Sequence, residues 1–177
     1  VEEIYFAHNQ KQKMESFYGD LKSQDVPNRV THNDTKLNNI LFDEKKRAVS
    51  IIDLDTVMPG KLHFDFGDAI RTLTNTANED EENLDEVAFN VQLFQAFTQG
   101  FLKETSHVLT VGEMKLLPFS PMYMTFLIGL RFLTDYLSGD VYFKTAYPEH
   151  NLVRARVQFK MVSLMQEQFN LMVDAFS

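Results

Sequence analysis

The residues with the clearest chemical potential lie in one short polar stretch, residues 31–39, which reads Thr-His-Asn-Asp-Thr-Lys-Leu-Asn-Asn. A charged turn follows, and then the sequence Ile-Asp-Leu-Asp at 52–55. Apolar runs at 39–42 and 48–52 flank the polar side chains and are typical of short strands. We therefore expect these strands to hold histidine, aspartate and asparagine side chains on a fixed frame.

Strand pairing would bring three of these polar residues together. If 40–42 and 48–52 pair about a turn near Lys46, Asn39 faces Asp53 at the open end of the hairpin, where cross-strand neighbours lie about 5 Å apart. An amide oxygen and a carboxylate are hard ligands of the kind that Mg²⁺ prefers, together with water and a substrate phosphate. Asp34 is then free to act as a base beside the metal. This set predicts phosphoryl transfer; the alternative is a polar surface loop rich in Asx turns.

The spacing His32-x-Asp34-x₄-Asn39 resembles the catalytic loop of eukaryotic-type protein kinases and of the aminoglycoside phosphotransferase and choline kinase superfamily. The asparagine after His32 and the Ile-Asp-Leu-Asp sequence resemble the small-molecule branch. The resemblance implies that Asp34 is the catalytic base and that Asn39 and Asp53 hold Mg²⁺. It also implies that His32 braces the loop by hydrogen bonding and that Lys36 contacts the cofactor ATP.

Two aspartates after the hairpin leave alternatives open. Asp55 is expected to be a second metal ligand or an acceptor of backbone hydrogen bonds, and the metal role is preferred. Residues 65–67 spell Asp-Phe-Gly, the magnesium-binding tripeptide of protein kinases, but Asp53 already fills that role. Asp65 is therefore predicted to cap the following helix, with Asp65 and Asp68 near its positive end.

A later segment, residues 129–144, combines side chains suited to acceptor binding. Sugars are recognised by fixed hydrogen bonds to hydroxyl groups and by aromatic stacking on ring faces. The segment supplies Arg131, Asp135, Tyr136 and Tyr142 for these contacts. The alternative for Arg131 and Asp135 is an i,i+4 salt bridge. The chain has no Trp, which a cage for a quaternary ammonium ligand favours, so a sugar is the preferred acceptor.

Longer strings between residues 32 and 165 are similar to the N-acetylhexosamine 1-kinases of this superfamily. They include Asp-Leu-Asp-Thr-Val-Met-Pro-Gly at 53–60, Asp-Phe-Gly-Asp at 65–68 and Arg-Phe-Leu-Thr-Asp-Tyr-Leu at 131–137. The similarity implies ATP-dependent phosphorylation of the anomeric hydroxyl of GlcNAc or GalNAc. Choline, aminoglycoside and homoserine kinases are the alternatives within the superfamily. A non-catalytic binding relic of the fold is the alternative from another class.

The elements that must position these residues are mostly helices. Periodicity and capping signals predict helices over 2–17, 65–77, 84–104, 111–117, 119–138 and 151–175, a further strand over 29–31, and a turn at Pro59-Gly60. Thr110 and Glu113 have the spacing of a capping box. The predicted fold class is α+β and mainly helical. It is one domain over 1–177, a kinase-like C-terminal lobe with a small hairpin that carries the catalytic loop.

Composition and charge exclude several other classes. The 177 residues are 44% hydrophobic and 24% charged, which is typical of a globular domain. A net charge of −8 argues against nucleic acid as a partner. The absence of cysteine excludes a disulfide framework and, with no visible signal peptide, favours a cytoplasmic protein. The apolar stretch 116–133 contains two prolines and is predicted to be a buried core helix, so no membrane partner is expected.

The resembling families place a nucleotide-covering pair of strands and a phosphate-contacting lysine before the catalytic loop. Only one helix precedes the loop in this sequence, so we expect a C-terminal lobe without its N-terminal lobe. Its small-molecule partners are then a sugar and Mg²⁺-ATP, held between two lobes. The open face is expected to expose apolar groups that allow self-association, and the isolated chain is expected to be inactive.

Overall fold

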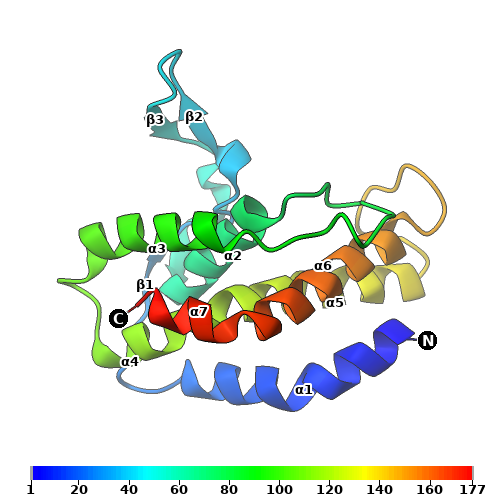
Figure 1. The fold of residues 1–177 in the computed structure, drawn as a ribbon, viewed down its shortest axis with the longest axis horizontal. Helices are drawn as coiled ribbons and strands as arrows, with labels where there is room; N and C mark the ends of the chain where they lie inside the picture. The colour runs from blue at the N-terminus through cyan, green and yellow to red at the C-terminus, as the bar shows by residue number, and fades with distance from the viewer. Residues whose placement is uncertain (1, 177) are drawn as a thin grey trace.

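A pair of long helices runs through the centre of the fold (Figure 1). The computed structural model describes residues 2–176. α5 (Ser120–Leu137) and α6 (His150–Glu167) lie side by side, and α2 (Leu62–Thr74) packs on α5. Around them lie α1 (Glu2–Asp20), α3 (Val91–Thr105), α4 (Val111–Leu116), α7 (Phe169–Asp174) and the 3₁₀ turns η1 (Leu37–Asn39), η2 (Leu54–Thr56) and η3 (Leu117–Phe119).

The helix α2 is packed tightly on two sides. Phe66 is 1% exposed, and its ring contacts three phenylalanine rings of α3. Gly67 lies against the start of α5, where an added Cβ would be 2.5 Å from the Ser120 carbonyl oxygen. Because interiors have no room for such an overlap, only glycine allows the two helices to approach this closely. Phe66 and Gly67 of the Asp-Phe-Gly tripeptide therefore anchor α2 in the core.

The most apolar helix lies inside the fold. By length and composition alone, residues 111–137 could cross a membrane, with a mean hydropathy of 1.4 over the most apolar window. A core helix passes the same test, and 56% of that window is buried by the rest of the structure. Leu117, Phe126 and Leu133 belong to the hydrophobic core. The predicted burial of this stretch is therefore confirmed.

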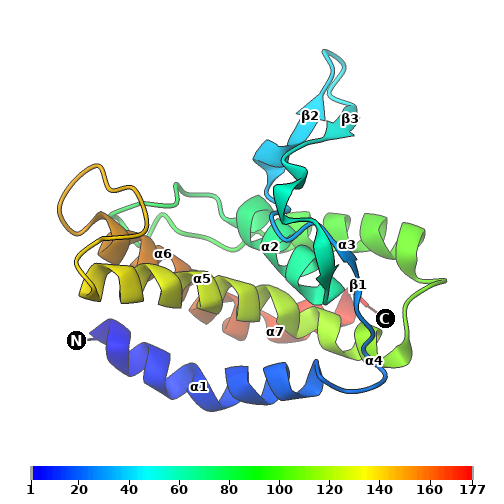
Figure 2. The ribbon, with the colours of Figure 1, turned by 180° about the vertical axis from the view of Figure 1, so that it is seen from behind.

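The strands form two separate two-stranded sheets. β2 (Ile40–Phe42) and β3 (Ala48–Ile51) make the predicted hairpin, which projects from the helical body (Figures 1 and 2). β1 (Arg29–Thr31) pairs with β4 (Met58–Gly60). The predicted turn at Pro59-Gly60 is wrong, because Pro59 lies in β4 opposite Val30. Proline is tolerated there since β4 is an edge strand.

Several helix limits differ from the prediction. α2 begins at Leu62, before the predicted start at 65. α3 begins at Val91 instead of 84, because the Asn90 side chain caps it by accepting a hydrogen bond from the Leu93 N–H at 3.0 Å. The last predicted helix is two helices, α6 and α7, which meet at Gln168.

The predicted capping box is confirmed, and its Glu113 also binds Arg29 of β1. Thr110 and Glu113 exchange their hydrogen bonds at the start of α4. The fully buried Glu113 carboxylate also accepts two hydrogen bonds from the Arg29 guanidinium of β1, at 2.9 and 2.7 Å. Burial would raise the pKa of Glu113, but Arg29 and the Thr110 N–H outweigh it and hold the pKa below its usual value. This pair fixes β1, and so the entry to the polar loop, to α4.

Removing the Arg29 cation should destabilise the fold. Arg29→Met leaves Glu113 buried without its partner, so the free energy of unfolding should fall by about 3 kcal/mol at pH 7. A depressed carboxyl pKa stabilises the fold above the ordinary carboxyl pKa, and the effect is lost as pH falls through the folded-state pKa. The difference in free energy of unfolding between the variant and the wild type should therefore become smaller below about pH 4. Urea denaturation at several pH values measures both effects.

A matched control is Arg47→Met, which removes a largely exposed ion pair with Asp43 in the hairpin turn. That loss should be much smaller than the loss in Arg29→Met, because solvent screens an exposed ion pair. Equal losses in the two variants, or a difference that does not change with pH, would contradict the role of Glu113.

Candidate active site

The polar loop between β1 and β2 is held by one carboxylate of α2. Asp65 accepts hydrogen bonds from the backbone N–H groups of His32 and Asn33, both at 2.7 Å. Its carbonyl oxygen accepts a further bond from the Thr35 hydroxyl at 2.6 Å. Asn33 has a left-handed backbone, with φ of 64°, which a residue other than glycine keeps only when its surroundings hold it there. The loop conformation therefore depends on Asp65.

The prediction that Asp65 caps α2 is wrong. The helix begins at Leu62 and Lys61 occupies the cap position, so Asp65 already lies inside the first turn. Asp68, the second acid near the helix start, pairs with Arg71 at 2.8 Å. The anchoring role of Asp65 was missed because its partner is a loop 33 residues earlier, and local spacing carries no signal of that contact.

Asp34 lies at the centre of a small charged cluster. Its Oδ2 atom accepts hydrogen bonds from the Lys36 ammonium at 2.7 Å and from the Asn39 amide at 2.8 Å. The same amide nitrogen donates to the Asp34 carbonyl oxygen at 2.9 Å, and Asn39 is only 5% exposed. Asp34 Oδ1 makes no hydrogen bond with a residue that the structure describes. A carboxylate with one oxygen held and one open is suited to accept a proton.

The charges around Asp34 favour its ionised form. Partial burial would raise its pKa, but the hydrogen bonds from Lys36 and Asn39 and the charge of Lys36 outweigh burial and hold the pKa below its usual value. In return, the hydrogen bond with Asp34 raises the pKa of Lys36, and the charges of Asp53 and Asp68 add to this effect. Asp34 is therefore a carboxylate at neutral pH, as a general base must be.

His32 joins the loop to the base of the hairpin. Its Nε2 lies 3.1 Å from the Ile52 carbonyl oxygen, so Nε2 carries the proton and donates it. The Thr56 hydroxyl donates to the His32 carbonyl oxygen at 2.6 Å. The buried Nδ1 atom has no hydrogen-bond partner within residues 2–176. These contacts are those of a bracing residue, as predicted, whereas the part played by Thr56 was not anticipated.

Asn39 and Asp53 both lie at the open end of the hairpin, but one residue away from the predicted register. The Ile52 N–H donates to the Asn39 carbonyl oxygen at 3.0 Å, so Asn39 faces Ile52. Asp53 follows in a left-handed conformation, with φ of 63°, and its side chain is exposed. The prediction that Asn39 directly faces Asp53 is therefore wrong. The ladder ends with the pair Ile40 and Ile51, and the chain turns at Asp53.

This donor set fits a metal ion that is shared with a phosphate. The Asn39 amide nitrogen is committed to Asp34, which leaves its amide oxygen free, and the Asp53 carboxylate has no hydrogen bond or ion pair within the described chain. Asp55 lies exposed on η2, likewise without such a bond. In residues 2–176, no group of three or more His, Cys, Asp or Glu side chains is placed to hold a metal alone. Mg²⁺ needs only one or two carboxylates when phosphates complete its shell.

Most of the residues predicted to bind the acceptor form a second cluster, at the end of α5 and in the loop 138–149 (Figures 1 and 2). The Arg131 guanidinium lies over the rings of Tyr142 and Phe143, at 5.5 and 5.2 Å from their centroids. These three residues line a cavity of about 390 Å³. Tyr136 instead bonds to Glu149 at 3.5 Å, outside this lining. Among the described residues, no hydrogen bond or ion pair joins Arg131 or Tyr142 to Asp34.

Asp135 has a structural role in this cluster. It is 5% exposed and accepts the backbone N–H groups of Val141, Tyr142 and Phe143 at 2.8–3.1 Å, and the Asn151 amide at 2.9 Å. Burial would raise its pKa, but the three backbone donors outweigh burial and hold the pKa below its usual value. Since these donors occupy the carboxylate, the geometry argues against both the predicted sugar contact and the predicted salt bridge with Arg131.

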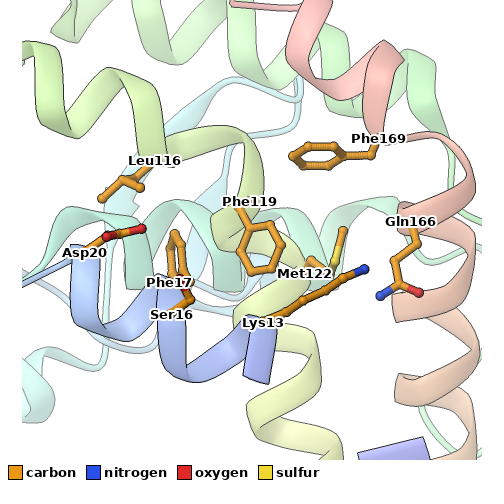
Figure 3. A pocket seen from close by; sticks show the side chains of 9 residues that line it. All are labelled: Lys13, Ser16, Phe17, Asp20, Leu116, Phe119, Met122, Gln166 and Phe169. Carbon is orange, nitrogen blue, oxygen red and sulfur yellow. The ribbon is translucent and has the colours of Figure 1, made fainter. Parts of the chain in front are cut away.

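A separate cavity of about 450 Å³ lies beside α1, on the side of the body away from the hairpin (Figures 1 and 3). Its walls are mainly apolar, with Phe17, Phe119 and Phe169 among them, and Lys13 and Gln166 also contribute. None of the predicted catalytic, metal-binding or acceptor-binding residues lines this cavity, so it is not part of the candidate site.

Comparison with protein-family models gives a match to the family described as APH, phosphotransferase enzyme family, over residues 5–99. The matched region is more than half of the chain and contains most of α1, the polar loop, the hairpin and α2. Asp34, Asn39 and Asp53 all lie within it, whereas the cluster around Arg131 lies outside. Enzymes of this family transfer phosphate to small molecules with ATP and a divalent metal, and the mainly helical structure with its small sheets fits their kinase-like α+β fold. The chain therefore belongs to the APH phosphotransferase enzyme family and is an enzyme of the kinase type.

Proposed function

We propose that this chain carries the catalytic lobe of an ATP- and Mg²⁺-dependent sugar kinase. Its acceptor would be the anomeric hydroxyl of an N-acetylhexosamine, GlcNAc or GalNAc. The observation that carries the proposal is the geometry of the Asp34 carboxylate, which is held on one oxygen by Lys36 and Asn39 and is open on the other. The family match supports a small-molecule kinase. The sugar is inferred from the cluster around Arg131 and from the similarity to N-acetylhexosamine 1-kinases.

In the proposed reaction, Asp34 takes the proton of the acceptor hydroxyl as its oxygen attacks the γ-phosphorus of ATP. The new O–P bond forms while the bond to the β,γ-bridging oxygen breaks, and ADP leaves with that electron pair. Lys36 lies beside Asp34, from where its ammonium can reach the transferred phosphate. Asn39, Asp53 and Asp55 would hold Mg²⁺, which supplies positive charge to the phosphate oxygens.

The cluster at the end of α5 favours a neutral acceptor. Tyr142 is 74% exposed and offers a ring face, and Arg131 offers N–H donors beside it. Arg131 also occupies the position over the aromatic rings that a cationic ligand would take. Choline and aminoglycosides would therefore meet repulsion here, whereas a sugar would not. Tyr136, which lies outside the cavity, is proposed to act at its edge.

We further propose that a nucleotide-covering lobe packs on the β2–β3 hairpin. Leu41, Phe42, Val49 and Ile51 are 47–61% exposed on this one projecting element (Figure 2). Apolar side chains gathered in this way mark an interaction surface. Without the covering lobe, the same surface would allow two copies of the chain to associate.

A panel of acceptors tests the proposed reaction. With ATP and Mg²⁺, the complete two-lobed enzyme should phosphorylate GlcNAc or GalNAc, and phosphorus–proton coupling in NMR should place the phosphate on the anomeric oxygen. Residues 1–177 alone should show no activity above background, because the nucleotide would lie uncovered. Faster transfer to choline, homoserine or an aminoglycoside would overturn the sugar assignment. No transfer to any acceptor would favour a binding relic, and activity of the isolated chain would contradict the separate lobe.

Asp34→Asn tests the catalytic base. Asparagine can keep the hydrogen-bonded frame but cannot accept a proton, so kcat should fall by about 10²–10⁴ while nucleotide binding stays close to normal. Steady-state kinetics and calorimetry with ATP measure the two quantities. A variant that retains more than about a tenth of the wild-type kcat would show that another group takes the proton.

Lys36→Met tests the contact with the nucleotide. Loss of a charge-assisted bond to phosphate should raise the KM for ATP by about tenfold or more, with a smaller change in the KM for the sugar. Lys103→Met, at an exposed position of α3 away from the hairpin, is the matched control and should leave both constants unchanged. If kcat fell with no change in the KM for ATP, Lys36 would serve only to orient Asp34.

A further inference from the structure

The extended segment between α2 and α3, residues 75–90, lies against the loop 138–149 at the end of the helical body (Figures 1 and 2). Two of its acidic residues, Glu79 and Asp80, contact residues at the start of α6. No role was predicted for either acid from the sequence, and neither touches the candidate active site. Their contacts nevertheless connect them to the loop that lines the cavity of Arg131 and Tyr142.

Glu79 lies between two arginines that come from different helices. Arg71 of α2 places its Nη1 atom 3.6 Å from one carboxylate oxygen, and Arg154 of α6 places its Nε atom 3.6 Å from the other. The arginine side chains are only 12% and 19% exposed. The Arg154 Nε atom is buried and makes no hydrogen bond within the described chain. A guanidinium in this setting needs a nearby anion. Asp68 supplies one to Arg71 at 2.8 Å. Glu79 is a second anion for Arg71 and the nearby anion for Arg154.

Arg154 links Glu79 to the loop that lines the cavity. It donates hydrogen bonds to the Lys144 carbonyl oxygen at 3.1 Å and to the Asn151 side chain at 3.2 Å. Asn151 in turn donates to Asp135, whose carboxylate holds the backbone of 141–143. The loop that carries Tyr142 is therefore connected to Glu79 through the side chains of Arg154, Asn151 and Asp135.

Asp80 makes a second connection to the same loop. Its carboxylate lies 3.2 Å from His150 Nε2 and 3.5 Å from the Tyr147 hydroxyl. The Nδ1 atom of His150 accepts a hydrogen bond from the Ala146 N–H at 3.1 Å. Nε2 therefore carries the ring hydrogen and donates a hydrogen bond to the Asp80 carboxylate. The segment 75–90 therefore holds the loop at Lys144, through Arg154 and Glu79, and at Tyr147, through Asp80.

We infer that Glu79 and Asp80 are positioning residues for the acceptor, which clamp the loop of the Arg131 cavity. Glu79 links this loop, through Arg154, to Arg71 of α2. Asp80 holds the end of the same loop on the segment 75–90.

The helix α2 also holds the catalytic loop through Asp65. α2 would therefore position both the acceptor site and the loop that carries Asp34. Glu79 acts at the Arg71 end of α2 and Asp65 near the opposite end. The inference rests on the proposed function in taking this cavity as the acceptor site.

The first test uses Glu79→Gln and the double variant Glu79→Gln/Asp80→Asn, which remove charge and keep shape. The matched control is Glu86→Gln, which makes the same charge change in the same segment at an exposed side chain without a partner in the described chain. Hydrogen exchange of the amides in 141–147, followed by mass spectrometry, should speed up by about two- to fivefold in the first variant and more in the second. Exchange in residues 32–39 should not change. Exchange in 141–147 equal to that of the control would overturn the clamp.

The second test separates positioning from simple stability. In the complete enzyme with GlcNAc and ATP, Glu79→Gln should raise the KM for GlcNAc by about two- to fivefold, with the KM for ATP and kcat unchanged. Glu79→Asp, which keeps the charge, should recover part of the loss. Faster exchange without a change in the KM for GlcNAc would overturn the link to the acceptor. If the wild-type enzyme phosphorylated no sugar, the proposed function would fail, and the exchange result would still decide the clamp.

Discussion

The Asp65 carboxylate accepts the backbone N–H groups of His32 and Asn33, and these two bonds set the direction in which the polar loop leaves β1. Hydrogen bonds to an ionised acceptor are stronger than those between neutral groups, and here they act on backbone atoms, so they fix the chain itself. These hydrogen bonds can fix the loop only if Asp65 itself is held rigidly. Phe66 and Gly67, the neighbours of Asp65 in sequence, supply it by packing α2 against α3 and α5. Core packing and site geometry thus come from three consecutive residues.

Arginine makes most of the internal charged links in a chain whose net charge is −8. Arg29 joins β1 to α4, Arg71 joins α2 to the segment after it, and Arg154 joins α6 to the loop of the second cavity. Each guanidinium bonds to more than one group, which its planar fork of donors allows and which lysine could not reproduce. The surplus of acids is therefore not only a solvated surface. Part of it lies inside, paired with these three cations.

The sequence was most informative where the partners are close along the chain. The hairpin, the capping box of Thr110 and Glu113 and the grouping of Asp34 with Asn39 follow from local spacing, and the structure has them. Two of the errors share one cause, which is a partner distant in sequence. Asp65 bonds to a loop 33 residues earlier, and the strand with Pro59 pairs with residues before the hairpin. Asp135 was predicted to contact a sugar or to pair with Arg131, because helical spacing alone does not show that the loop after it folds back over its carboxylate.

The hairpin places Asn39 at the foot of two strands that have three and four residues and whose apolar side chains are largely exposed. A two-stranded hairpin of this size is only marginally stable in water by itself. Its order and the binding of anything that rests on it are therefore linked equilibria, and part of the binding free energy is used to hold the strands in place. The affinity of this protein for its nucleotide is then set in part by side chains on the outer half of the hairpin, which the nucleotide does not have to touch.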